Sequence, residues 1–141
     1  MRVGDEVQGT AWCTERYGAD GRAFTGAGMG KLAPADEAAL IDPVFATALL
    51  RSMHEALRQG VGGYAQDVVS QGMPWSFPLD ATVAPVWVHH GEVDSMTPPA
   101  HGRHTAAIVP GARLVTWPDQ GHISLTTKIP EIAAELVATM R

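Results

Sequence analysis

A pattern of strand, helix and strand in the second half of the chain most constrains its fold. Residues 84–90 and 112–117 are short runs rich in β-branched, aromatic and other apolar side chains, and a polar turn follows each run. The stretch between them, residues 98–109, begins with two prolines and is ended by Pro110 and Gly111, as expected of a helix. A helical crossover of this length joins parallel strands. The sequence therefore predicts an α/β protein with a parallel sheet.

An acid and a base follow these two predicted strands. Asp94 lies in the turn after the first strand, and His122 lies in the turn after the second. Neighbouring parallel strands are about 4.8 Å apart and end at the same edge of the sheet, so the two side chains are expected to meet there. A carboxylate that binds an imidazole fixes its tautomer and orients the ring as a general base. The spacing thus predicts an acid–base pair that needs a nucleophile.

The two loops also resemble those of a known family. Residues 90–98 read HGEVDSMTP, which contains the form G-x-x-D-x-x-x-P around Asp94, and Gly121 precedes His122. This arrangement is similar to the last two strands of an α/β-hydrolase. In that family the acid of a nucleophile–acid–histidine triad follows the penultimate strand, and the histidine follows the final one. The resemblance covers residues 80–141 and implies that Asp94 and His122 are the acid and the base of such a triad.

The resemblance divides the chain into three parts. Residues 80–141 are expected to form the C-terminal part of the hydrolase domain, with a closing helix that starts at Ile129 and packs its apolar stripe on the sheet. Residues 34–79 resemble the helical lid that many of these hydrolases insert before the penultimate strand. Residues 1–33 are Gly-rich, lack a periodic pattern and are expected to be poorly structured. The predicted fold is a partial α/β-hydrolase-like parallel sheet with crossover and closing helices, preceded by lid-like helices.

Two aromatic side chains lie where the predicted lid leads back into the sheet. Trp75 and Phe77 belong to the turn-rich residues 72–78. They are candidates for contacts with the acyl group of a substrate, and packing of the lid onto its own core is the alternative. The resemblance implies a small-molecule, ester-like substrate and an esterase-like or lactonase-like reaction, although a fold by itself does not select among substrates.

The chain lacks the nucleophile of the family. That residue sits in an elbow of the form G-x-S-x-G, and the nearest glycine cluster, residues 26–30, holds no hydroxyl, thiol or carboxylate between its outer glycines. The single cysteine, Cys13, lies in a polar stretch without a strand–turn–helix pattern. Ser95 and Ser124 are close to the pair, but they are expected to form hydrogen bonds within their turns. We therefore expect the C-terminal part of a hydrolase, truncated before its serine and nearly inactive alone.

A non-catalytic role is the main alternative to hydrolysis. Parallel sheets are normally covered on both faces and contain more than two strands. Two strands alone leave an unpaired, apolar edge that favours pairing with another chain. The sequence is therefore also compatible with a binding module or a half-sheet that completes a protein partner, or that self-associates through this edge.

Composition and charge argue against other classes of partner. The formal net charge is −5 and the basic residues are scattered, so no nucleic-acid partner is expected. No apolar run is long enough to cross a membrane, and a single cysteine suits a cytoplasmic protein.

A metal site is a further alternative. His101 and His104 form an i, i+3 pair on the predicted helix, a spacing that binds zinc when a third ligand converges. No glutamate lies between them as in H-E-x-x-H. His89 and His90 are neighbours on a strand and point to opposite faces, so they do not chelate one ion together. We expect neither a bound metal nor a cofactor.

Overall fold

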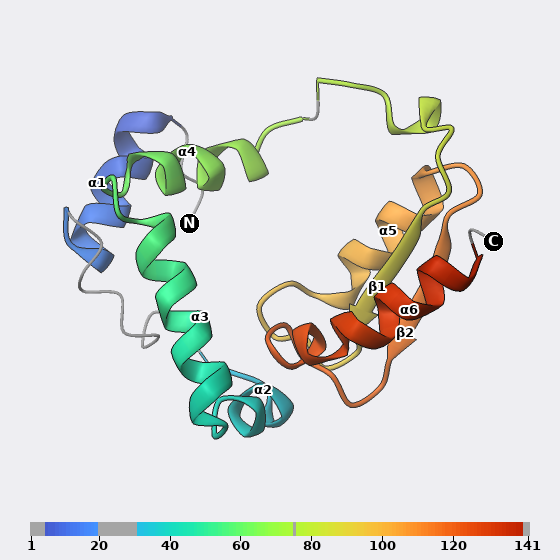
Figure 1. Cartoon of the computed structure of the whole chain (residues 1–141). Helices are drawn as coiled ribbons and strands as arrows, with labels where there is room; N and C mark the ends of the chain where they lie inside the picture. The colour runs from blue at the N-terminus through green and yellow to red at the C-terminus, as the bar shows by residue number, and fades with distance from the viewer. Residues whose placement is uncertain (1–4, 20–30, 75, 140–141) are drawn as a thin grey trace. The chain divides into compact units, whose positions relative to one another are not determined.

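The computed structural model describes residues 5–19, 31–74 and 76–139 (Figure 1). The chain divides into two compact units. The helical unit comprises Met1–Met29 and Val44–Ser76, and the sheet unit comprises Gly30–Pro43 and Phe77–Arg141. The predicted lid-like region, 34–79, is thus shared between the units, because its first helix packs with the C-terminal part of the chain.

The helical unit contains a helix that the sequence did not predict. Helix α1, Glu6–Tyr17, lies within the part expected to be poorly structured. The Asp5 side chain accepts a hydrogen bond from the backbone N–H of Gln8 and so caps the first turn. The buried residues of α1 recur every fourth position, at Gly9, Cys13 and Tyr17. This stripe is narrow, and one of its members is a glycine, so a search for apolar periodicity misses it.

The other helices of this unit lie within residues 34–79, the region that resembles a helical lid. They are α3, Pro43–Ala56, and α4, Gly62–Gln71. Gly60 has a positive φ of 93° in the turn between them. The core lies between α1 and α4 and consists of Cys13, Tyr17, Leu57, Val61 and Ala65, with Trp12, Met53 and Tyr64 packed against it.

The sheet unit confirms the predicted α/β class. Strand β1, Trp87–Gly91, and strand β2, Arg113–Trp117, are parallel, with Trp87 opposite Arg113 and Gly91 opposite Trp117. Helix α5, Pro99–Ile108, connects them and packs on both. The first strand starts three residues later than the run at 84–90 predicts.

Three short elements and a closing helix complete the sheet unit. The short elements are helix α2, Pro34–Ala39, and the 3₁₀ turns η2, Leu79–Ala81, and η3, Ser124–Lys128. The closing helix α6, Ile129–Thr139, starts where predicted, but none of its residues is buried. Its stripe was expected to pack on the sheet. The described sheet has two strands, which is too little surface to cover the apolar stripe of a three-turn helix.

The loops that follow β1 and β2 are held together by backbone contacts. Glu92 N–H donates to Trp117 O at 2.9 Å, and Val93 N–H donates to Gln120 O at 3.2 Å. A Cβ atom at Gly91 would overlap the Gln120 carbonyl, so only glycine permits this approach. The ends of both strands therefore lie side by side. Among the described residues, no helix is long and apolar enough to span a bilayer.

Candidate active site

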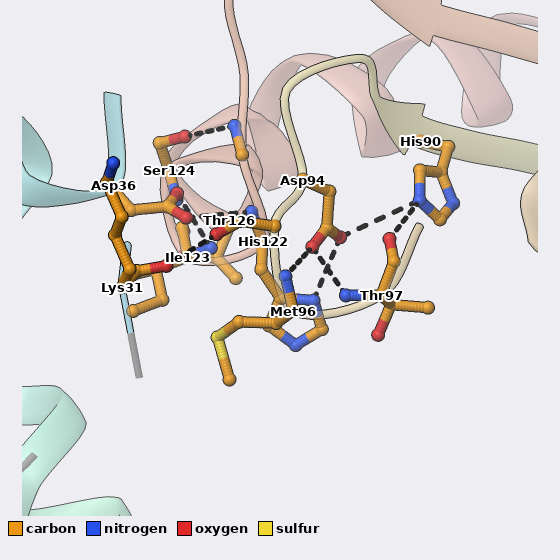
Figure 2. Close-up of polar contacts among 12 residues, drawn as sticks. Lys31, Asp36, His90, Asp94, Met96, Thr97, His122, Ile123, Ser124 and Thr126 are labelled. Atoms are coloured by element: carbon orange, nitrogen blue, oxygen red, sulfur yellow. Dashed lines mark hydrogen bonds and ion pairs between the residues drawn. The ribbon is translucent and has the colours of Figure 1, made fainter. Parts of the chain in front are cut away.

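Asp94 is fixed in the loop after β1 by its own side chain. Its Oδ1 atom accepts hydrogen bonds from the backbone N–H groups of Met96, at 2.9 Å, and Thr97, at 2.7 Å (Figure 2). An aspartate that bonds the backbone two and three residues ahead closes a tight turn. The side chain is only 6% exposed. Oδ1 thus holds the loop through these two bonds, and the same bonds fix the orientation of the other oxygen, Oδ2.

The second oxygen of Asp94 binds the predicted base. Asp94 Oδ2 lies 3.0 Å from His122 Nδ1. An ionised carboxylate only accepts hydrogen bonds, so Nδ1 carries the proton and donates it, and Nε2 holds the free lone pair. The His122 side chain is 45% exposed, and no described residue forms a hydrogen bond with its Nε2. The structure thus brings the two predicted residues together as an oriented acid–base pair with an accessible basic nitrogen.

A second histidine contacts the same carboxylate. His90 Nε2 lies 3.0 Å from the Thr97 carbonyl oxygen and 3.6 Å from Asp94 Oδ2. Because a carbonyl only accepts, Nε2 carries a proton and donates it to Thr97. The ring is 13% exposed and lies against Gly102 of α5, where a Cβ atom would come within 2.6 Å of Nδ1. The alternation of side chains along β1 predicts that His90 and His89 lie on opposite faces of the strand. The contact between His90 and Asp94 depends on the turn after β1, which the sequence pattern does not describe.

A buried aspartate from the N-terminal part of the sheet unit reaches the histidine loop. Asp36 of α2 accepts hydrogen bonds from the backbone N–H groups of His122, Ile123 and Ser124. It is fully buried and was not predicted as a site residue. The sequence carries no local signal for this contact, since 86 residues separate Asp36 from His122.

The hydroxyl and thiol groups considered as nucleophiles have other partners or lie elsewhere. Ser95 Oγ donates to the Lys31 carbonyl at 2.9 Å, and Ser124 Oγ accepts from Gly121 N–H at 2.8 Å. Ser124 thus has the hydrogen-bonding role within its turn that the sequence predicted, whereas Ser95 bonds to a residue 64 positions away in the chain. Cys13 is buried in the core of the helical unit, and burial raises the pKa of its thiol, which disfavours the reactive thiolate.

The remaining predicted residues are placed as follows. Phe77 is 60% exposed, and Trp75 lies outside the described residues, so their role in substrate contact stays a prediction. His101 and His104 are exposed on α5. Within the described ranges, no three His, Cys, Asp or Glu side chains are grouped to hold a metal ion. His89 lies on the opposite face of β1 from His90, and its Nδ1 accepts from Trp117 Nε1 at 3.2 Å.

Comparison with known proteins identifies the family. Residues 68–139 match the profile of a family described as TAP-like protein, which belongs to the α/β-hydrolases. The matched region is just over half of the chain, and it contains both strands, the crossover helix, Asp94 and His122. No curated protein and no solved structure matched the chain. On the strength of the matched region, the chain belongs to the TAP-like family of α/β-hydrolases.

Proposed function

We propose that this chain supplies the acid and the general base of a hydrolase that cleaves ester-like bonds in small molecules, in an esterase-like or lactonase-like reaction. The nucleophile is a serine from outside the 141 residues. One observation carries the proposal: His122 Nδ1 is 3.0 Å from the buried Asp94 carboxylate, while its Nε2 has no hydrogen-bond partner among the described residues. This is the arrangement that a base needs to accept a proton from a serine hydroxyl.

In the proposed reaction His122 acts first as a base and then as an acid in each of two half-reactions. His122 Nε2 takes the serine proton as the hydroxyl oxygen attacks the substrate carbonyl, and Asp94 stays ionised and stabilises the imidazolium. His122 then gives this proton to the departing alkoxide, which leaves an acyl–serine ester. Water attacks that ester with Nε2 again as the base. The carboxylic acid product is released, and the serine regains its proton from His122.

The proposal predicts that the chain alone has almost no activity. The members of a triad act as a unit, and loss of one removes most of the rate enhancement. Without the serine of a nucleophile elbow, the His122–Asp94 pair positions only water. This expectation separates the proposal from a model in which one of the chain's own hydroxyl or thiol groups acts as the nucleophile.

Complementation tests the proposed function. The chain is combined with the N-terminal half of a TAP-like hydrolase that carries its serine elbow but neither acid nor histidine. Hydrolysis of a p-nitrophenyl ester and labelling by a fluorophosphonate are then measured. We expect both signals only in the mixture, and a loss of about 10³- to 10⁴-fold in turnover with Asp94→Asn or His122→Ala.

The control for these variants is His101→Ala, which removes an exposed histidine from α5. It should leave turnover unchanged. Activity in the mixture that persists in both site variants would contradict the proposed roles, and so would serine labelling that is equal with and without this chain.

A second function has one observation in its favour. The described sheet consists of β1 and β2 alone, and the outer edge of β1 has no strand partner among the described residues. Such an edge is a surface for strand addition. We therefore propose, as the alternative, a non-catalytic half-sheet that completes another chain or self-associates. Its signature is stable association in solution together with no gain of esterase activity in the complementation assay.

A further inference from the structure

The turn that carries His122 is bound through its backbone by Asp36. Asp36 Oδ2 accepts from His122 N–H at 3.1 Å, and Oδ1 accepts from Ile123 N–H at 3.0 Å and from Ser124 N–H at 2.8 Å (Figure 2). These N–H groups precede or begin η3, where a helical turn cannot supply its own acceptors. A single carboxylate therefore satisfies three consecutive donors in a fully buried position.

The fit between Asp36 and this turn leaves little space. A Cβ atom at Gly121 would overlap both carboxylate oxygens and the carboxyl carbon of Asp36. Ser124 closes the turn from inside, because its Oγ accepts from Gly121 N–H. The backbone on both sides of His122 is thus held by side-chain acceptors, and Asp36 is the one that comes from a distant part of the chain.

The same N-terminal segment also contacts the loop of the acid. Lys31, five residues before Asp36, accepts a hydrogen bond from Ser95 Oγ through its carbonyl oxygen. Ser95 is the neighbour of Asp94, so residues 31–36 contact both loops that carry the pair. This segment lies outside residues 68–139, which match the family profile.

We infer that Asp36 is a positioning residue for His122. It fixes the backbone nitrogen of the histidine, while Asp94 fixes Nδ1 of the ring, so that two carboxylates hold the backbone and the side chain of one residue. Asp36 acts through the position of His122 and touches no reacting atom. The role of Asp36 in catalysis rests on the proposed function. Its effect on the position of the His122 backbone and ring can be measured without any substrate.

The sharpest variant is Asp36→Asn in the full chain. Its amide oxygen can replace Oδ1, which binds two N–H groups, and its NH₂ group then faces His122 N–H, a contact between two donors. The bond to His122 is lost while the other two remain. Glu37→Gln is the matched control, because it removes the same charge from an exposed neighbour on α2.

Two readouts separate positioning from a merely structural role. Amide hydrogen exchange at His122 should be at least about tenfold faster in Asp36→Asn than in Glu37→Gln, the factor expected for the loss of one bond to a charged acceptor. Heteronuclear NMR of the imidazole nitrogens should show the Nδ1–H tautomer of His122 in the control and a mixture of tautomers in Asp36→Asn. The imidazole signals of His89 should not change, because this ring lies on the opposite face of β1.

A folded Asp36→Asn protein with unchanged exchange and tautomer at His122 would overturn the inference. If the variant does not fold, the wild-type chain still tests it. The amides of His122, Ile123 and Ser124 must then be protected from exchange, and rates like those of an unfolded peptide would overturn it. Failure of the complementation assay with a normal result here would count against the proposed function and leave the positioning role intact.

Discussion

The two oxygens of Asp94 have different partners, and this makes one substitution informative. Oδ1 accepts from the backbone of Met96 and Thr97, whereas Oδ2 binds His122 Nδ1. An asparagine at position 94 keeps the two backbone bonds only if its oxygen takes the place of Oδ1, so its NH₂ group must face the imidazole. We predict that Asp94→Asn converts His122 from the Nδ1–H to the Nε2–H tautomer, because the amide donates where the carboxylate accepted.

Heteronuclear NMR of the imidazole nitrogens measures this change directly. Glu92→Gln removes a charge from an exposed position in the same loop and should leave the tautomer as it is. In the proposed hydrolase the converted ring has no lone pair at Nε2, so the loss of turnover in the complementation assay should accompany the change in tautomer. A ring that stays Nδ1–H in Asp94→Asn would contradict the assignment of Oδ2 as its acceptor.

The packing of His90 against α5 gives a prediction about stability. A Cβ atom at position 102 would lie 2.6 Å from His90 Nδ1, so Gly102→Ala forces the ring away from Asp94 or the helix away from β1. We expect a loss of about 1–3 kcal/mol in the free energy of unfolding, even after the gain of about 1 kcal/mol that alanine brings to a helix.

The same substitution in α4 is the comparison. Gly63 has nothing within 4 Å of an added Cβ, so Gly63→Ala should stabilise by up to about 1 kcal/mol. Urea unfolding of the two variants, monitored in their respective units by amide exchange, measures both effects. Stabilisation by Gly102→Ala as well as by Gly63→Ala would show that close packing at His90 does not limit position 102.

At the scale of elements, the sequence predicts what local patterns encode. The two apolar runs predict strands β1 and β2, and the prolines and glycine around 98–111 predict helix α5 between them. Proline and glycine mark the ends of the helix because they restrict or widen the backbone conformations that are allowed there. The parallel pairing then follows from the crossover, and it brings Asp94 and His122 together. The contact between Asp94 and His122 was therefore predictable from spacing.

The contacts that the sequence does not predict have a common cause. Asp36 binds donors that are 86 to 88 residues away, whereas apolar periodicity and turn motifs report only on near neighbours in the chain. Helix α1 was missed because its buried stripe contains only three residues, one per turn, and begins with Gly9. The sequence pattern shows that one face of α6 is apolar, and from this we predicted that the sheet covers it. The pattern does not show which surface packs on that face, and in the structure no residue of α6 is buried.

The packing of α1 on α4 predicts a pH dependence at the scale of these helices. Burial, together with the nearby Tyr17 hydroxyl group, raises the pKa of Tyr64 from about 10 to about 12. The packed state thus favours the neutral phenol. Its contribution to stability is complete below the unfolded pKa near 10 and is lost as the pH rises through the folded value near 12. The helical unit should therefore become less stable between about pH 10 and about pH 12.

Tyr64→Phe tests this dependence. The variant keeps the ring that packs edge-to-face on Tyr17 at 5.7 Å but has no group to ionise. Thermal unfolding, with tyrosinate absorbance as a second signal, should show a smaller loss of stability over this pH range in the variant than in the wild type. Equal losses would mean that Tyr64 ionises normally and that other groups cause the change.

At the scale of the whole molecule, the sheet has an edge whose polar groups can be assigned. The Val86 carbonyl accepts from Arg113 N–H, and Glu92 N–H donates to the Trp117 carbonyl, so even-numbered residues of the first strand bond to β2. In a parallel ladder the backbone N–H and C=O groups of alternate residues point to opposite edges of the strand. Trp87, His89 and Gly91 therefore direct their N–H groups to the outer edge, where the described part of the chain offers no strand.

This assignment yields a matched pair of variants. His89→Pro removes one outward N–H and leaves the β1–β2 ladder intact, because proline is tolerated at an edge when its missing donor faces outward. His89→Ala loses the ring and its bond to Trp117 but keeps the N–H. If the chain associates through this edge, sedimentation velocity at rising concentration should show assemblies for the wild type and His89→Ala, and mainly monomers for His89→Pro. Equal association of both variants would place the contact on another surface, and the exposed apolar residues of α6 would then be the next to substitute.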